Sequence, residues 1–174
     1  MYIPASTAET RPAALHALIS AYPLGMLVSH GAAGLDADHI PFEIAPGAAP
    51  LGVLRAHVAR ANPLSRNDGG AVMVVFRGES GYVAPSAMGF GVGNTRVVPT
   101  WDYSVVHVHG RLRTVDDPAW IMALLRRQSA VHEATEMQPW SPDDAPPDYI
   151  GRLLKAIVGI EIVIERLDGK NKTG

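Results

Sequence analysis

The longest strand candidate in this chain is residues 100–115, which read TWDYSVVHVHGRLRTV. Successive side chains of a strand point to opposite faces, so Val106, Val108 and Leu112 share one face. The other face carries a mixture of aromatic, apolar and imidazole side chains, namely Trp101, Tyr103, Val105, His107 and His109. One apolar face beside one mixed face predicts a strand that covers a hydrophobic core on a single side.

Shorter strand candidates precede and follow this segment. They are residues 24–29, 35–44, 51–58, 71–76, 81–84 and 157–167, with a turn at residues 30–34. Short strands at close spacing are typical of an antiparallel barrel or sandwich and not of a parallel, doubly wound sheet. We therefore expect a mainly β (α+β) fold, an antiparallel barrel with helices at its rim.

Helical patterns occupy two parts of the chain. Residues 8–21 carry an apolar stripe, and Ser6 or Thr7 can cap this helix at its start. A second helical segment covers residues 117–155, with Asp116 as the expected cap, and ends at the closing strand. We expect the whole chain to form one domain.

The composition excludes several classes of protein. Of the 174 residues, 47% are hydrophobic and 18% charged, which is unlike a disordered chain, and the net charge of −2 is unlike a strongly basic nucleic-acid binder. Cysteine is absent, so there are no disulfides, thiolate metal sites or cysteine nucleophiles. No leader and no membrane-spanning run is evident, and we expect a soluble, cytoplasmic protein.

Two patterns resemble metal sites. Residues 132–136 read HEATE, where a zinc-protease helix needs a second histidine in place of the last glutamate. His107 and His109 share one strand face and could hold a metal if His39 or His57 supplied a third ligand. The alternative for each histidine is a packed or hydrogen-bonded ring, and we expect no metal.

The strand ends also carry residues that suit a phosphate-bearing aromatic ligand. Arginine grips phosphate oxygens with two parallel hydrogen bonds, and aromatic rings offer surface to a planar ring system. The candidates are His39, Arg55, His57, Arg60, Asn62, Thr100, Trp101 and Tyr103. The alternative is that the arginines are surface charges and the aromatic residues belong to the core.

Several segments together resemble the PaiB family of FMN-binding negative transcriptional regulators. They occur in the family's order and span nearly the whole chain. The segments are MYIP at 1–4, GL at 34–35 with HIPF at 39–42, HVARANP at 57–63, PS at 85–86, VVPTW at 97–101, Tyr103 with His107, and KAIVGIEI at 155–162.

This resemblance implies an FMN-binding split barrel, the fold that pyridoxamine-phosphate oxidases share. It also implies a homodimer with the flavin in the cleft between subunits. The activity would be that of a flavin-dependent oxidoreductase or of a flavin-linked regulator. The positions that match family motifs and are expected to line the cleft are His39, His57, Arg60, Asn62, Ser86, Thr100, Trp101, Tyr103 and Lys170.

The chain departs from the family pattern in ways that affect the cofactor. Asp38 stands where the family has threonine, and Asp102 stands where it has asparagine. Residues 87–91 replace a segment that in the family carries aromatic residues and a lysine. Added carboxylates and a lost cation oppose a phosphate group, so we expect FMN to bind more weakly than the family pattern implies.

Two other functions remain open. One is transcriptional regulation without redox catalysis, although direct nucleic-acid binding has little support, because Arg126-Arg127 is the only adjacent basic pair and no helix-turn-helix pattern is evident. The other is a metal or haem site built on His107 and His109. For the flavin-dependent reaction, His107 is the best candidate for proton transfer.

Overall fold

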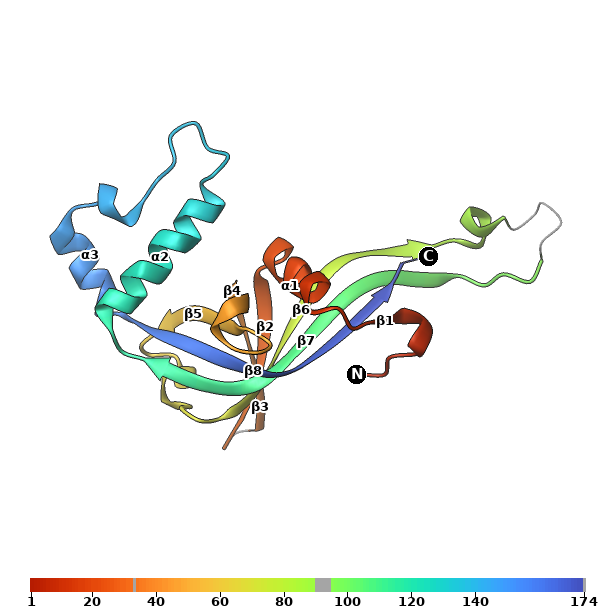
Figure 1. The fold of residues 1–174 in the computed structure, drawn as a ribbon, viewed down its shortest axis with the longest axis horizontal. Coiled ribbons are helices and arrows are strands. Elements are labelled where there is room, and N and C mark those ends of the chain that lie inside the picture. Colours follow the sequence, from red (N-terminus) through yellow and green to blue (C-terminus); the bar gives the residue numbers. More distant parts are fainter. Residues whose placement is uncertain (33, 90–94, 174) are drawn as a thin grey trace.

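The structure is a computed structural model in which residues 1–32, 34–89 and 95–173 are described. Their strands form one antiparallel sheet in the order β3-β2-β6-β7-β8-β5-β4, and β1 pairs with the end of β8 (Figure 1). The strands are β1 (Ala8–Glu9), β2 (Leu24–Gly31), β3 (Gly34–Pro41), β4 (Glu43–Ala45), β5 (Val53–Ala59), β6 (Ala71–Val83), β7 (Thr100–Val115) and β8 (Ile157–Lys172). The helices are α1 (Pro12–Ala21), α2 (Pro118–His132) and α3 (Pro147–Leu154).

A very short connection makes this sheet curl. β3 and β4 lie at opposite ends of the strand order, yet only Phe42 separates them in the chain. The two ends of the sheet must therefore approach each other. Among the described residues no backbone ladder joins β3 to β5, and one contact across the gap is a hydrogen bond from Asn62 Nδ2 to Asp38 Oδ1 (2.8 Å). This open seam confirms the predicted split barrel.

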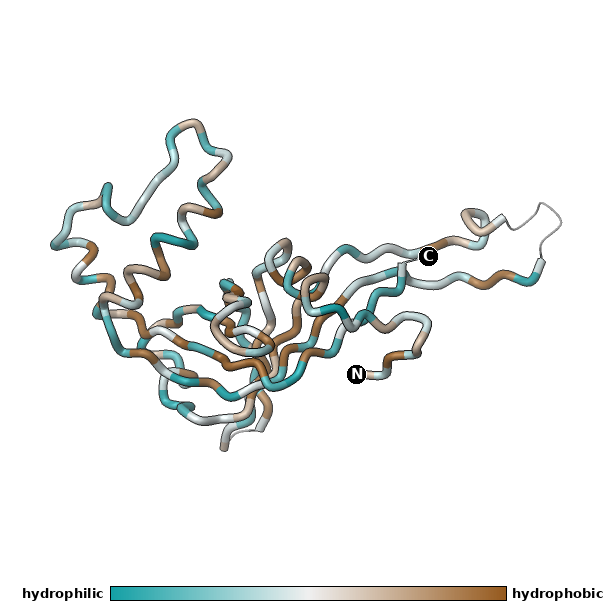
Figure 2. Tube along the Cα trace, in the orientation of Figure 1, coloured by the Kyte–Doolittle hydropathy of each residue, from teal (hydrophilic) through white to brown (hydrophobic). Residues whose placement is uncertain are grey.

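The core lies inside the curled sheet. Val106, Val108 and Leu112 are buried there as predicted, and the central strands are the most hydrophobic part of the trace (Figure 2). Phe42 packs edge-to-face on Phe76, with ring centroids 5.8 Å apart. The residue that joins the two ends of the sheet is thus itself part of the core.

β7 has its predicted bounds, but its neighbours are longer than expected. The prediction of two separate strands at 71–76 and 81–84 was wrong, because β6 runs unbroken beside β7 with a bulge between Arg77 and Ser80. β8 likewise continues to Lys172 because β7 offers it a partner along its whole length. The ends of β6 and β7 extend beyond the barrel as an arm (Figure 1).

Helix α1 begins later than the sequence predicted. Ala8 and Glu9 pair with β8 as a strand, and neither Ser6 nor Thr7 caps the helix. The reason is Pro12 in the first turn, since a residue before proline is driven to an extended conformation and proline suits the start of a helix.

Helices α2 and α3 project from the end of the sheet opposite the arm (Figure 1). Asp117, and not the predicted Asp116, caps α2 by accepting a hydrogen bond from the Ala119 N–H (2.8 Å). In the described part of the chain, no helix is both long enough and apolar enough to cross a membrane.

Helix α2 is seated on the sheet through a glycine. A Cβ atom added to Gly159 of β8 would lie 2.4 Å from Cζ3 of the Trp120 ring, so the absence of a side chain lets the ring pack against the strand. An alanine at this position must displace the ring and with it the start of α2.

We expect Gly159→Ala to lower the free energy of unfolding by about 1–3 kcal/mol, the usual cost of overpacking. In a Trp120→Ala background the same change is expected to cost less than in the unaltered protein, because the ring is gone and only the Val115 carbonyl oxygen, 3.0 Å from the added Cβ, stays close. Urea unfolding of the four proteins of this double-mutant cycle measures both values. Gly81→Ala is the control, since nothing lies within 4 Å of its added Cβ; equal losses at both glycines would contradict this account.

Candidate functional site

The nine predicted site residues fall into two groups in the folded chain. The barrel-end group is His39 on β3, His57 on β5, and Arg60 and Asn62 just after β5. The others lie at or beyond the arm, toward the opposite end of the molecule (Figure 1). These are Ser86, Thr100, Trp101, Tyr103 and Lys170. One chain therefore does not bring all nine residues into one site.

The arm exposes an aromatic pair beside a lysine. Trp101 is 55% exposed and Tyr82 57% exposed, and their rings meet edge-to-face with centroids 6.0 Å apart. Lys172 Nζ donates hydrogen bonds to the Trp101 carbonyl oxygen (2.7 Å) and to the Thr100 hydroxyl. Sequence analysis missed Tyr82 and Lys172, which cross-strand pairing places beside Trp101 and Tyr103.

A second lysine and ring complete this surface. The ammonium of Lys170 lies 5.1 Å from the centroid of the Tyr103 ring, a cation–π contact, and donates a hydrogen bond to the Tyr2 carbonyl oxygen (3.4 Å). Asp102 lies between Trp101 and Tyr103 in the strand, so alternation places its side chain on the other face. We call Tyr82, Trp101, Tyr103, Lys170 and Lys172 the arm cluster.

Ser86 stands apart from the arm cluster. It is exposed in the short 3-10 turn Pro85–Met88, and its carbonyl oxygen accepts a hydrogen bond from the Gly89 N–H (3.2 Å). The residues that follow in the segment departing from the family pattern, 90 and 91, lie outside the described residues.

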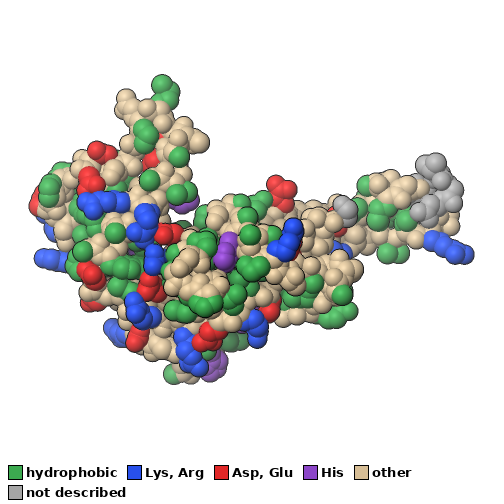
Figure 3. Space-filling view, in the orientation of Figure 1, with side chains coloured by type: hydrophobic (Ala, Val, Ile, Leu, Met, Phe, Trp, Pro, Cys, Tyr) green, Lys and Arg blue, Asp and Glu red, His purple; other side chains and the backbone are tan. Residues whose placement is uncertain are grey.

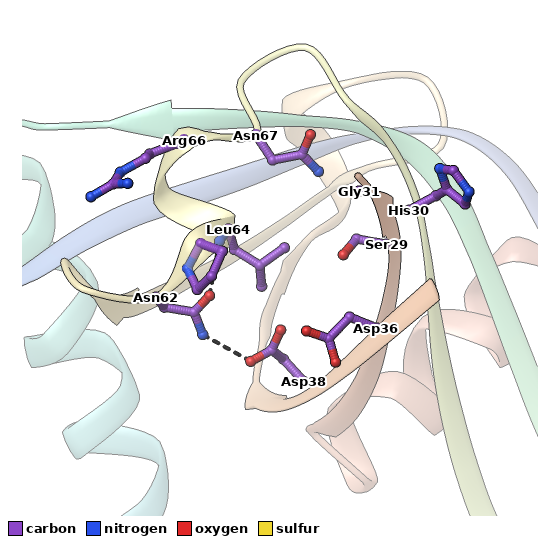
Figure 4. Close-up of a pocket in the computed structure, with 10 residues that line it drawn as sticks. Ser29, His30, Gly31, Asp36, Asp38, Asn62, Leu64, Arg66 and Asn67 are labelled. Atoms are coloured by element: carbon purple, nitrogen blue, oxygen red, sulfur yellow. Dashed lines mark hydrogen bonds between the residues drawn. The ribbon is translucent and has the colours of Figure 1, made fainter. Parts of the chain in front are cut away.

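An acidic pocket of about 240 Å³ opens at the barrel end (Figure 4). Asn62 holds one wall: its side-chain oxygen accepts from the Leu64 N–H (2.8 Å), and its Nδ2 donates to Asp38 (2.8 Å). Asp36 and Asp38 both line the pocket, which also contains Arg66. Two carboxylates against one guanidinium do not suit a phosphate group, so this pocket by itself does not fit the phosphate of FMN.

Arg60 serves the structure of the barrel end. Its guanidinium donates to both carboxylate oxygens of Asp116 (2.8 and 2.6 Å) and to the carbonyl oxygens of Lys155 (2.9 Å) and Ile157 (3.0 Å). Four of its five N–H donors are therefore used within the chain. The hydrogen bonds to Asp116 raise the pKa of Arg60 and lower that of Asp116. Arg60 thus ties the end of β5 to the ends of β7 and α3.

His57 and His107 share an unusual property. The Nδ1 atom of each is buried and has no hydrogen-bond partner among the described residues. Burial lowers the pKa of both rings; the N-terminal ammonium group and His109 lower that of His107 further, while Asp168 opposes them. Both imidazoles are therefore neutral at pH 7.

His109 lies on the same face of β7 as His107, as predicted, and the centroids of the two rings are 6.4 Å apart. Charged side chains surround His109. Its Nε2 is 2.9 Å from an Arg166 nitrogen and 3.2 Å from Asp168 Oδ2. Burial and then Arg166 lower the pKa of His109, against the effect of Asp168. An arginine N–H can only donate and a carboxylate can only accept, so the tautomer of this ring decides whether Nε2 accepts from Arg166 or donates to Asp168.

These histidines do not assemble a metal site in the part of the chain that the structure describes. No three His, Cys, Asp or Glu side chains there are grouped to hold a metal ion. His39 and His57 belong to the barrel-end group, and the HEATE sequence lies at the end of α2. The hypothesis that either strand histidine supplies a third ligand has no geometric support within these residues.

The one adjacent basic pair is neutralised by acidic partners. Arg126 pairs with Asp143 (2.6 Å) and Arg127 with Glu43 (2.9 Å). Figure 3 shows acidic and basic side chains interspersed over the face in view. This distribution is unlike the continuous basic surface that nucleic-acid binding proteins present.

Comparison with known proteins gives a family. A family model described as "Putative FMN-binding domain" matches residues 1–166. An uncharacterized protein of Emericella nidulans is 32% identical over 209 aligned residues, which cover 99% of this chain and 83% of the fungal protein. An uncharacterized protein of Aspergillus fumigatus is 31% identical over 219 aligned residues, which cover 99% of this chain and 84% of that protein.

Solved structures show the same fold at low identity. The flavocytochrome Anf3 of Azotobacter vinelandii has a TM-score of 0.72 at 16% identity, over 97% of this chain and 71% of that one. A FAD and heme binding protein of Mycobacterium smegmatis has a TM-score of 0.68 at 15% identity, over 97% and 74% of the two chains. With the match over residues 1–166, the chain belongs to this family of FMN-binding domains.

Proposed function

We propose that this protein is a PaiB-type, FMN-binding homodimer that acts as a flavin-dependent oxidoreductase. The observation that carries the proposal is the arm cluster. It presents three aromatic rings and two ammonium groups where β6, β7 and β8 run out from the barrel into the arm (Figure 1). Rings stack on a flat isoalloxazine, and ammonium groups pair with phosphate, so this half of the site fits FMN chemically.

The homodimer follows from the division of the site. The arm cluster and the barrel-end group lie apart in one chain, and a two-fold dimer brings different surfaces of two chains together twice. In the proposed dimer the arm of one chain covers the barrel end of its partner. The arm then supplies the cations that the acidic pocket lacks.

Within the site, each group of residues has a separate task. Tyr82 and Trp101 hold the flat ring and exclude water from one face, while Lys170 and Lys172 neutralise the phosphate. Bound FMN supplies electron or hydride transfer. His107 and His109 lie on the same face of β7 as Trp101 and Tyr103, as neutral rings that can accept a proton.

The family and the fold support flavin binding, and two structural neighbours are a flavocytochrome and a FAD and heme binding protein. Arg126 and Arg127 are paired with acidic side chains and so do not offer free positive charge to DNA. We therefore favour an enzyme over a DNA-binding regulator, and any regulatory effect would arise through metabolism. The absence of cysteine is compatible with the reducing cytoplasm, where we place the protein.

The absorbance spectrum of the purified protein tests the cofactor. We expect flavin bands after FMN is added, and quenching of FMN fluorescence on titration. Retention of FAD in preference to FMN would contradict the choice of flavin. A haem Soret band without flavin uptake would instead support the alternative of a haem protein built on His107.

Lys170→Gln is expected to weaken FMN binding about fivefold or more, because it removes a cation that faces the phosphate. Arg152→Gln is the control, since this exposed arginine lies on α3, outside both the arm cluster and the barrel-end group. Fluorescence titration at low and high salt measures both, and the difference should shrink as salt screens the charge. Equal weakening by the two substitutions would show that Lys170 has no specific role.

Asp38→Asn is expected to tighten FMN binding about fivefold, since it removes one carboxylate yet keeps an oxygen for the hydrogen bond with Asn62. The control is Asp148→Asn on exposed α3, which leaves the acidic pocket unchanged. Isothermal titration of flavin-free protein gives both affinities. Unchanged affinity in Asp38→Asn would mean that the phosphate does not lie near the acidic pocket.

A mixing experiment tests the shared site. Trp101→Ala and His39→Ala alter opposite halves, so each homodimer has two damaged sites. After the two variants are mixed and re-equilibrated, half of the dimers are mixed and each has one intact site, so about a quarter of all sites recover FMN binding. No recovery, or a monomer in sedimentation, would exclude a site formed between chains.

A further inference from the structure

A cavity of about 300 Å³ lies where α2 and α3 cover the end of the sheet. Its walls are mostly apolar side chains of the two helices, including Leu125, Ile150 and Leu153. His57 of β5 also lines it, and Trp140 and Pro142 contribute from the connector between the helices. The cavity is distinct from the acidic pocket, with which it shares no lining residue.

The cavity offers no charge to a ligand. Its lining side chains are uncharged apart from His57, and burial lowers the pKa of His57 so that this ring is neutral at pH 7. Removing a charged ligand from water into such surroundings carries a large desolvation cost. The lining therefore selects against anions and cations.

His57 supplies one directed hydrogen bond. Its Nδ1 is buried without a partner. An unpaired acceptor is tolerated in proteins better than an unpaired N–H, so the ring carries its proton on Nε2. The Nε2–H group of His57 is then a hydrogen-bond donor that an acceptor oxygen of a ligand can pair with.

The mouth of the cavity is also apolar. Trp140 and Leu153 are 47% and 46% exposed although both line the cavity. Exposed large apolar side chains beside a cavity are typical of ligand sites. An apolar cavity of about 150 Å³ holds one benzene ring, so a space of about 300 Å³ has room for two fused rings.

We propose that this cavity binds an uncharged bicyclic aromatic molecule that carries one acceptor oxygen, which His57 orients. The helices provide the apolar enclosure. The imidazole provides the polar contact from the sheet, and Ser129 of α2 adds a hydroxyl group to the lining. The site does not depend on flavin, so it is tested on the full chain freed of flavin, and a failure here is separate from a failure of FMN binding.

The test is isothermal titration with 1-naphthol and with naphthalene, which differ by one hydroxyl group. Both are expected to bind, with 1-naphthol about three- to tenfold tighter because only it reaches His57 with an oxygen. Equal affinities in the unaltered protein would overturn the role of His57. Absence of any binding of either compound would overturn the site itself.

Two variants locate the binding. His57→Phe keeps a ring of similar size and is expected to abolish the advantage of 1-naphthol while leaving naphthalene binding unchanged. His132→Phe, an exposed histidine of α2 that does not line the cavity, is the control and should change neither affinity.

Ala156→Leu fills the cavity from an exposed position in its wall, so it is expected to retain the fold. We expect both compounds to bind at least tenfold more weakly. Retained binding in Ala156→Leu would place the compounds elsewhere and refute the proposal, even if His57→Phe failed to fold.

Discussion

The one-residue connection at Phe42 is the constraint on which this molecule depends. β3 hydrogen-bonds to β2 and β4 to β5, so the chain passes from one end of the strand order to the other in a single step. The sheet can satisfy both sets of hydrogen bonds only by curling. The curl encloses the core, leaves a seam between β3 and β5, and sets the barrel-end group beside that seam.

Three long strands give the molecule two parts with different roles. Where β6, β7 and β8 lie in the barrel, their inner faces are buried, and the bulge opposite His109 and Gly110 lets β8 keep its pairing with β7. A Cβ at Gly110 would lie 2.2 Å from the Val163 carbonyl oxygen, so only glycine allows this close approach. Beyond the barrel β6 and β7 have no core to cover, and their aromatic side chains are exposed.

The polar groups of the barrel divide into those that are fully paired and those that are not. Glu161 is buried and accepts hydrogen bonds from Arg55 (3.0 Å) and Arg113 (2.8 Å), and four of the five N–H donors of Arg60 are used within the chain. These groups hold strand ends together. His57 and His107 instead each keep a buried Nδ1 atom without a partner among the described residues, which costs free energy.

The sequence by itself determined the antiparallel fold and the bounds of β7, because alternation reports which face of a strand is buried and needs only local information. It did not reveal that β6 is one strand or that residues 8 and 9 form a strand, since pairing with β7 and with β8 decided these. It also did not reveal that Asp117 caps α2, which the position of Pro118 in the first turn decided. Residue types at the site were evident too, but not their grouping. Only the tertiary structure showed that Arg60 is committed to Asp116, that Lys172 and Tyr82 join Trp101, and that His57 faces an apolar cavity, because partners far apart in the chain become neighbours only when the sheet curls.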